Sequence, residues 1–298
     1  MARMDPLTVF LQAVVSGISM GCVYALVALG FVLVYKATEV VNFAQGELMM
    51  VGAFFAYTLV DLGGMPFIPG VLLALVVTAV FGVALNHLLL RPLIGSPAFT
   101  IVLATVAVST LLRSVVGVVP GWGEETHRLS NPLAGQVLRI GNFVVSAEHL
   151  MVIAVTIVLV LLLYLFFSRS RIGVALQATS QNQLAAGYCG ISIHGMFGLI
   201  WGISAAVAAL AGVLLAPAAF VHVNMGYIGL KAFPAAVLGG FGSLPGAVVG
   251  GLIIGVVEEL AGLYAPEGVK NVVAYAVLLL VLMVRPQGLF GISKRVRV

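Results

Sequence analysis

Long apolar stretches separated by short polar segments run through almost the whole chain. A helix needs about 17–25 apolar residues to cross a bilayer. Runs of that length or slightly shorter fall at 7–35, 68–86, 97–112, 150–167, 196–221, 243–264 and 271–284. Two further pieces, 48–60 and 232–241, are too short to cross comfortably alone. The pattern predicts an all-α integral membrane protein: a polytopic helical bundle in which residues 1–298 form one transmembrane domain of about 8–9 segments, broken or short helices included.

The most informative interruption follows the first long run. A polar segment occupies residues 42–47, and the apolar pattern restarts at once with Leu48. A bilayer offers no water to free backbone groups, so such a break needs a cavity, the interface or other protein beside it. Breaks of this kind commonly mark the path of a solute. The residues that we place on a translocation path or gate here are Asn42, Gln45, Gly46 and Glu47.

A comparable interruption occurs in the second half of the chain. Three glycines and a proline break an apolar stretch: Gly239, Gly240, Gly242 and Pro245. Paired interrupted segments in the two halves of a transporter point to the translocation path, so we predict that these four residues belong to it as well. The alternative is tight packing, because glycines at four-residue spacing over 246–255 let helices approach closely.

Composition admits only a membrane protein. Of 298 residues 62% are hydrophobic and only 8% charged, with a mean hydropathy of +1.19, whereas soluble domains carry about 25% charged residues. The net charge of +4 does not indicate nucleic-acid binding, because the basic residues lie in short loops and one tail rather than on one clustered face. The five histidines are scattered without ligand spacing, so no metal site is expected.

Loop charges predict the orientation. The loop 168–195 carries Arg169 and Arg171 without an acid, and the tail from Arg285 is also basic, so both should be cytoplasmic. The remaining basic residues of the tail are Lys294, Arg295 and Arg297. The segment 113–149 balances three arginines against three glutamates and reads as an external loop. Counting crossings backwards from Arg169 leaves the N-terminus outside.

The cytoplasmic loop 168–195 contains a second candidate site. Residues 171–190 have the composition of a short helix, on which Leu176, Leu184 and Tyr188 recur near one face. Gln181 and Asn182 lie on other faces. A helix of this kind either lies at the membrane interface or inserts into a groove of a partner protein.

Four segments carry a family resemblance that covers nearly the whole chain in order. They are 24–30 (YALVALG), 42–47 (NFAQGE), 231–247 (KAFPAAVLGGFGSLPGA) and 285–291 (RPQGLFG). In these segments the chain resembles the LivH-type permeases, the membrane subunits of branched-chain amino acid ABC importers. Relatives of this kind serve several amino acids, amides and urea, so the resemblance is specific to the family and weakly specific to the substrate.

The resemblance implies a multi-pass permease of the bacterial inner membrane that works without a cofactor. It implies a homologous second permease subunit, two ATP-binding subunits, an external solute-binding protein and a small-molecule substrate, with lipid around the bundle. It also implies that the 171–190 helix couples the permease to the ATPase, through Leu176, Gln181, Asn182, Leu184 and Tyr188. A permease for urea or short amides stays open as an alternative.

Two other classes of protein, secondary transporters and enzymes, fit the sequence less well. An ion-coupled secondary transporter usually needs carboxylates inside the membrane, and the middle of each full span lacks them. The string G-x-S-x-G at 17–21 is typical of a nucleophile elbow, but it lies inside an apolar run and equally spells a helix-packing pattern. A P-loop needs a lysine followed by serine or threonine, and none of the lysines in this sequence is followed by either residue. We therefore predict a transport subunit without its own nucleotide site, not an enzyme.

Overall fold

The computed structural model describes residues 6–93, 96–123, 125–140, 143–266 and 268–291. The tail residues Lys294, Arg295 and Arg297 and the loop residue Glu124 lie outside the described residues. Within them, six helices are long and apolar enough to cross a membrane, and two shorter apolar stretches, Met225–Gly239 and Val269–Val284, add to these. The prediction of a polytopic helical membrane protein with short or broken segments is confirmed.

The helices of the first half are α1 (Pro6–Thr38), α2 (Gln45–Tyr57), α3 (Phe67–Leu85), α4 (Ala98–Val118) and α5 (Ala147–Arg169). Short π-helices extend α2 through Thr58–Leu62 and α3 through Asn86–Leu90. The second half contains α6 (Arg171–Gln181), α7 (Gln183–Tyr188), α8 (Ile193–Ala219), α9 (Met225–Leu230), α10 (Ala232–Gly239), α11 (Leu244–Tyr264) and α12 (Val269–Val284). A hairpin of β1 (Val137–Ile140) and β2 (Phe143–Ser146) precedes α5; the sequence pattern did not predict it.

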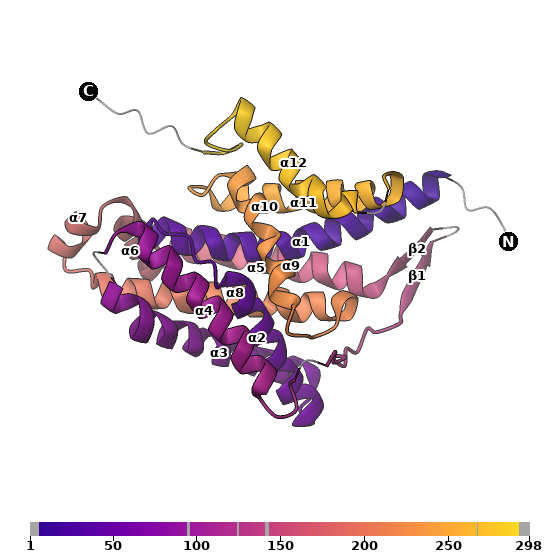
Figure 1. Ribbon diagram of the computed structural model, residues 1–298, viewed down its shortest axis with the longest axis horizontal. Helices are drawn as coiled ribbons and strands as arrows, with labels where there is room; N and C mark the ends of the chain where they lie inside the picture. Colours follow the sequence, from indigo (N-terminus) through magenta and orange to yellow (C-terminus); the bar gives the residue numbers. More distant parts are fainter. Residues whose placement is uncertain (1–5, 94–95, 124, 141–142, 267, 292–298) are drawn as a thin grey trace.

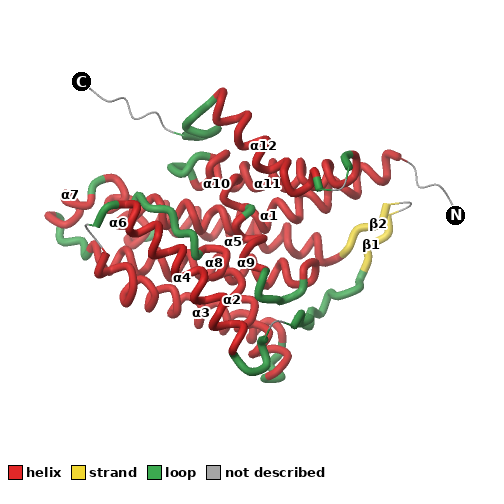
Figure 2. Tube along the Cα trace, viewed as in Figure 1, coloured by secondary structure: helices red, strands yellow, loops and turns green. Residues whose placement is uncertain are grey.

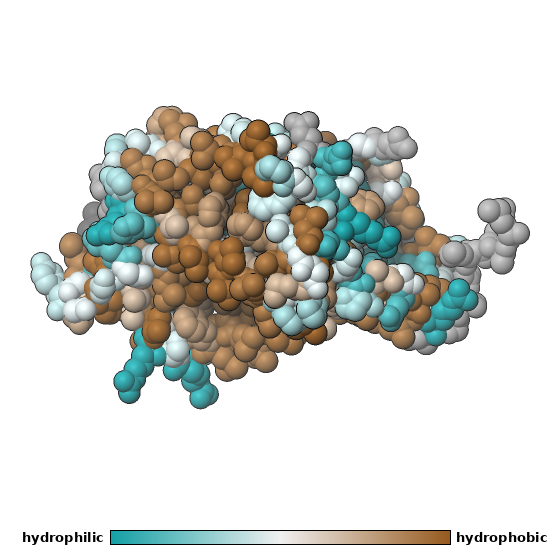
Figure 3. Space-filling view, turned by 90° about the horizontal axis from the view of Figure 1, so that it is seen from below, coloured by the Kyte–Doolittle hydropathy of each residue, from teal (hydrophilic) through white to brown (hydrophobic). Residues whose placement is uncertain are grey.

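The long axis of the bundle follows α1, which has 33 residues and is about 50 Å long. The C-terminal end of α1 lies beside α6 and α7, and its N-terminal end lies near the β-hairpin (Figures 1 and 2). We call these the α6–α7 end and the hairpin end. On the face seen in Figure 3, hydrophobic residues gather across the middle and polar residues toward both ends. The loops predicted to be cytoplasmic and external thus lie at opposite ends.

Helices α1 and α11 make the most extensive helix contact of the bundle, and glycines permit it. A Cβ on Gly17 or Gly21 would press on the α11 backbone at Val256 and Leu252. In return, a Cβ on Gly255 would overlap the backbone of Gly21. Close backbone approach of this kind is the usual way for membrane helices to associate. The glycine string at 17–21 is therefore a packing motif in this structure.

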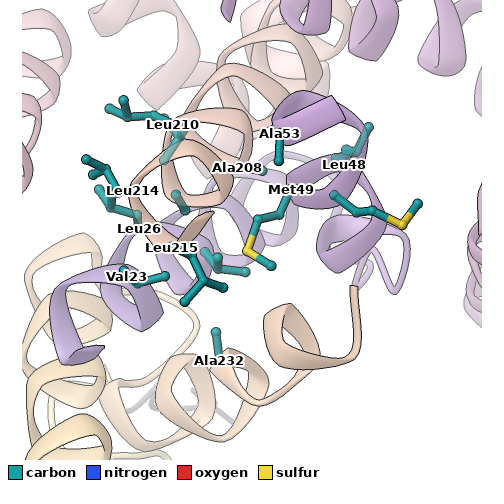
Figure 4. Close-up of a cluster of buried hydrophobic side chains, with 14 of the residues drawn as sticks. Val23, Leu26, Leu48, Met49, Ala53, Ala208, Leu210, Leu214, Leu215 and Ala232 are labelled. Atoms are coloured by element: carbon teal, nitrogen blue, oxygen red, sulfur yellow. The ribbon is translucent and has the colours of Figure 1, made fainter. Parts of the chain in front are cut away.

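The centre of the bundle is a tightly packed apolar core. Residues of α1, α2, α8 and α10 meet there (Figure 4). The side chains labelled in that view are Val23, Leu26, Leu48, Met49, Ala53, Ala208, Leu210, Leu214, Leu215 and Ala232. By contrast, most of α4 and α5 stays uncovered within this chain, with only 17% of each apolar window buried. These two helices are left to contact lipid or a neighbouring subunit.

One predicted boundary is wrong. Helix α4 does not stop at residue 112, and it continues to Val118. Arg113, which we assigned to the external loop 113–149, therefore lies inside a membrane-spanning helix. The loop starts only after Val118, where residues 119–123 and 125–131 cover the end of α2 through contacts such as the stacking of Trp122 on Phe54. Arg113, which follows the apolar run 97–112, is thus part of the helical bundle.

A valine at position 255 tests the α1–α11 crossing. Its Cβ would overlap the Gly21 backbone, so we expect Gly255→Val to lower the free energy of unfolding by about 3 kcal/mol. Gly117→Val is the control, because a Cβ at Gly117 meets no described atom within 4 Å. Thermal unfolding of the two variants in detergent gives the comparison, and equal midpoints would contradict the crossing.

Candidate functional site

The polar segment after α1 turns back into the bundle. The chain reverses at Glu39, which has a positive φ of 56°, and Gln45 then lies against Gly30, where a Cβ would overlap the Gln45 amide. Gly30 is eight residues before Thr38, the last residue of α1, which corresponds to about 12 Å of helix. Residues 39–44 are therefore a short non-helical stretch that reaches well inside the bundle.

Side chains satisfy the backbone and one another at this depth. Asn42 and Gln45 are 1% and 0% exposed. The Asn42 Oδ1 accepts a hydrogen bond from the Ala44 N–H at 3.0 Å, and the Gln45 Oε1 accepts one from the Asn42 Nδ2 at 3.3 Å. Ser204 of α8 donates to the same Gln45 oxygen at 2.9 Å, and the Gln45 Nε2 donates to the Ser204 carbonyl at 3.2 Å. The first of these bonds satisfies a backbone group of the break, and the others hold the Gln45 side chain against Asn42 and α8.

Glu47, two residues further along in the first turn of α2, forms a buried ion pair with Arg113 of α4. The Glu47 carboxylate is 1% exposed and also accepts a hydrogen bond from Ser109 at 3.2 Å. The Arg113 guanidinium carbon lies 3.6 Å from the ring centroid of Tyr227 in α9, a cation–π arrangement. The carboxylate packs directly against Gly226, where a Cβ would overlap it. Three helices, α2, α4 and α9, thus meet at this charge pair.

A row of polar groups on α4 faces the break. Thr105, Ser109 and Arg113 are spaced four residues apart and so share one helix face. The Phe43 N–H donates to the Thr105 hydroxyl at 3.2 Å, while the other two side chains reach Glu47. We call the set Asn42, Gln45, Glu47, Thr105, Ser109 and Arg113 the polar track. The four-residue spacing on α4 was visible in the sequence, but the loop assigned from residue 113 obscured it.

A cavity of about 320 Å³ opens at one end of the polar track. Asn42 and Thr105 line it, together with Asn86 of the α3 extension and Gln183 of α7. Gln183 belongs to the α6–α7 end, so the cavity leads from that end to the break. From there, the α4 row continues for about 12 Å toward the hairpin end, as far as Arg113. Gly46 stands beside the track, where its contact with Gly226 and Gly229 leaves no room for a Cβ.

The second interruption has a different local structure. Gly239 ends α10, Gly240 follows with a φ of 94°, and Pro245 stands in the first turn of α11. A Cβ on Gly239 would overlap the Gly246 carbonyl, so α10 and α11 form a closely packed helical hairpin. Gly242 meets no described atom within 4 Å of a built Cβ. These positions serve a tight turn, and the role in a gate that we predicted for them stays a prediction.

Aromatic rings connect the two interruptions. Phe43, in the first break, lies 5.6 Å from Phe233 of α10, and Phe233 lies 5.8 Å from Phe241, just after α10. Phe31 and Tyr35 of α1 complete the cluster at centroid distances of 5.9 and 4.6 Å from Phe233 and Phe241 respectively. The paired breaks that the sequence analysis singled out therefore do meet, through apolar contacts rather than through their polar residues.

A second buried charge pair lies between α11 and the joint of α9 and α10, and the sequence pattern did not predict it. Glu258 of α11 is 2% exposed. Its carboxylate accepts hydrogen bonds from Tyr24 at 2.6 Å and from Lys231 at 3.0 Å. Lys231 stands at the joint between α9 and α10 and also reaches Asn271 of α12. This network ties the joint to α1, α11 and α12, so Lys231 is not free to extend to the membrane surface.

The predicted single helix over 171–190 is two helices. Asn182 has extended backbone angles and caps α7 by accepting a hydrogen bond from the Ala185 N–H at 3.0 Å. Leu176 is 1% exposed and packs into the core between α1 and α8, whereas Leu184 and Tyr188 are 74% and 91% exposed. The three residues therefore do not share a face. Gln181, Leu184 and Tyr188 remain at the surface of the α6–α7 end.

Together these features define a polytopic helical membrane protein with a broken first half and a polar track through it. Comparison with known proteins identifies the family. Residues 13–282 match the sequence-family model that is described as the permease component of branched-chain amino acid transport systems. The chain belongs to this family, and the resemblance found in the sequence is confirmed.

Individual relatives agree along nearly their full length. The chain is 34% identical to the high-affinity branched-chain amino acid transport system permease protein BraD of Pseudomonas aeruginosa, over 95% of this chain and 96% of that protein. It is 33% identical to LivH of Escherichia coli strain K12, with the same coverage. The probable permease LivH of Methanocaldococcus jannaschii is 28% identical, over 90% and 88%. The chain is accordingly a multi-pass transport permease of the cell membrane.

Replacement of Gln45 tests the hydrogen-bonded break. Gln45→Leu leaves buried polar groups of Asn42 and Ser204 without that partner, so we expect a loss of about 2 kcal/mol in the free energy of unfolding. Adding Ser204→Ala removes the hydroxyl that bonds Gln45, so the bond between the two side chains is counted only once and the double variant should lose less than the sum of the single variants. Thermal unfolding of the four proteins measures the coupling. Strict additivity would show that the two side chains act independently.

Proposed function

We propose that this chain is the membrane permease subunit of an ABC importer that moves branched-chain amino acids across the inner membrane. The observation that carries the proposal is the polar track, which enters an otherwise apolar bundle from the cavity at the α6–α7 end. The names of the relatives support the substrate class. Residues 285–291 and 231–247, which resemble the family, meet in the fold, since the Leu289 N–H donates to the Leu238 carbonyl at 2.8 Å.

The polar track supplies the permeation path in this proposal. A small polar solute needs hydrogen-bonding partners along its way, because the hydrocarbon around it offers none. Asn42 and Thr105 provide them at the cavity, and Ser109 and Glu47 provide them deeper in the bundle. The aromatic cluster around Phe233 closes the space between the two breaks and is the natural place for a gate.

Separate subunits supply the energy. None of the lysines stands in a P-loop sequence, so ATP is hydrolysed by two partner ATPases, and a second permease and an external solute-binding protein complete the importer. The exposed Leu184 and Tyr188 of α7 form the contact with an ATPase. Leu176, which we first assigned to this contact, instead anchors α6 in the core, so that a push on α7 is transmitted to α1 and α8.

Ion-coupled secondary transport is the rival. Carboxylates inside the membrane are its usual requirement, and Glu47 and Glu258 meet it in position. Each of them, however, is paired with a basic residue, Arg113 and Lys231 respectively. A carboxylate whose charge is already balanced is a poor site for a coupling cation, so the ATP-driven importer remains the better proposal.

A bulky side chain on the polar track should block uptake. We expect Ser109→Phe to lower ATP-dependent uptake of leucine into proteoliposomes by about tenfold or more, since it fills the space beside Glu47. Thr110→Phe is the matched control on the exposed side of α4. The measurement uses the complete importer with its binding protein and ATP inside the vesicles. Uptake by Ser109→Phe at the level of the control would place the path elsewhere.

Acidic residues on α7 should weaken the ATPase contact. We expect the double variant Leu184→Asp, Tyr188→Asp to reduce the amount of ATPase that co-purifies with the permease by about tenfold. Because both side chains are exposed, the permease itself should still fold. The control Val137→Asp changes a residue that is also exposed but lies in β1 at the hairpin end, and the ATPase should co-purify with it normally. Undiminished co-purification of the double variant would exclude α7 as the contact.

A further inference from the structure

The ion pair between Glu47 and Arg113 is incompletely satisfied. The second carboxylate oxygen of Glu47, Oε2, is buried and has no hydrogen-bond partner among the described residues, and the same holds for the Nε of Arg113. Buried charges are normally surrounded by further hydrogen bonds that offset their desolvation. Here one acceptor and one donor are left over on the two partners of a single pair. A ligand that offers one hydrogen-bond donor and one acceptor could satisfy both of these groups.

The pair can be reached from one side. Arg113 keeps 21% of its side chain exposed, and Tyr227, on which it stacks, is 55% exposed. Glu47 stands in the first turn of α2, where the free N–H groups favour a negative charge. It lies beyond Asn42 and Gln45 along α2, toward the end of this helix that packs on Trp122 and His127 of the predicted external loop. A solute coming from the side of that loop would meet the charge pair before the hydrogen-bonded break.

We infer that Arg113 and Glu47 form the recognition site for the charged ends of a zwitterionic α-amino acid. The guanidinium of Arg113 binds the α-carboxylate, and the carboxylate of Glu47 binds the α-ammonium group. In the resting pair each side chain serves as the other's counter-ion. When the zwitterion enters, each exchanges that partner for one of opposite charge on the substrate. The inference rests on the proposed function and names the residues that select its substrate.

Charge balance gives the site its selectivity. Separating a buried ion pair without replacement leaves two uncompensated charges, which is strongly unfavourable. A zwitterion replaces both partners at once, and an arginine is suited to the planar carboxylate because its donors form a fork. Urea or a neutral amide carries neither charge and so cannot replace either partner of the pair. The site therefore favours amino acids over the amides that the resemblance alone left open.

A paired substitution separates recognition from structural support. The double variant Arg113→Met, Glu47→Gln removes both charges together, and such replacement of a buried ion pair is often tolerated by the fold. Lys231→Met with Glu258→Gln is the matched control, since it neutralises the other buried pair away from the polar track. Both are assembled with the ATPases and the binding protein in proteoliposomes. Leucine uptake and the ATPase activity stimulated by leucine-loaded binding protein are measured side by side.

The expected result is specific. The Arg113→Met, Glu47→Gln importer should lose about tenfold or more of its leucine uptake while its stimulated ATPase activity stays within about twofold of the wild type. The control importer should keep uptake within about threefold. Wild-type uptake by the first double variant, or an equal loss in both, overturns the inference. If the wild-type importer itself shows no ATP-dependent amino acid uptake, the proposed function fails instead.

Arg113→Lys covers the case in which the double variant does not assemble. Lysine keeps the ion pair with Glu47 and hence the fold, but it lacks the fork that binds a carboxylate at two points. We expect uptake about tenfold lower than in the wild type, at an unchanged amount of assembled complex. Undiminished uptake by this variant would show that Arg113 only holds α4 against α2.

Discussion

The requirement that backbone groups be satisfied inside a membrane governs the whole arrangement. Once α1 ends and the chain re-enters at residues 39–44, its N–H and C=O groups need partners that lipid cannot provide. Asn42 accepts the Ala44 N–H and Thr105 accepts the Phe43 N–H, while Ser204 holds the Gln45 side chain and so ties α8 to the break. Glycines at 46 and 226 then allow α2 and α9 to cross at contact distance. The polar track exists because a broken helix must be surrounded by polar side chains.

Much of this could be predicted from the pattern of the chain. The apolar runs, the break at 42–47 and the packing spacing of the glycines at 17–21 follow from general rules of bilayer length and helix approach. Arg113 escaped prediction for a physical reason. A charged residue ordinarily ends a span, and nothing local to α4 indicates that a glutamate more than sixty residues earlier lies close enough to neutralise it.

The break between α6 and α7 could not be predicted from periodicity. Periodicity placed Leu176, Leu184 and Tyr188 on one face because it assumes an unbroken helix. The extended backbone of Asn182 changes the direction of the chain, and the three side chains separate. A leucine buried by 99% and another exposed by 74% cannot be told apart by composition. The sequence pattern thus located the two helices that we propose as the ATPase contact, whereas the set of side chains exposed on them depended on Asn182, whose side chain prefers a cap to a helix interior.

The C-terminal segment has a mechanical consequence. The N–H groups of Leu289 and Phe290 donate to the carbonyls of Leu238 and Gly239, at 2.8 and 3.1 Å, and thereby occupy the free carbonyl end of α10. Helix α10 carries Phe233 of the aromatic cluster at its other end. The eight-residue helix α10 thus connects the C-terminal segment to the aromatic cluster. A displacement of residues 289–290 would therefore move α10 and, with it, the ring of Phe233 in the interior.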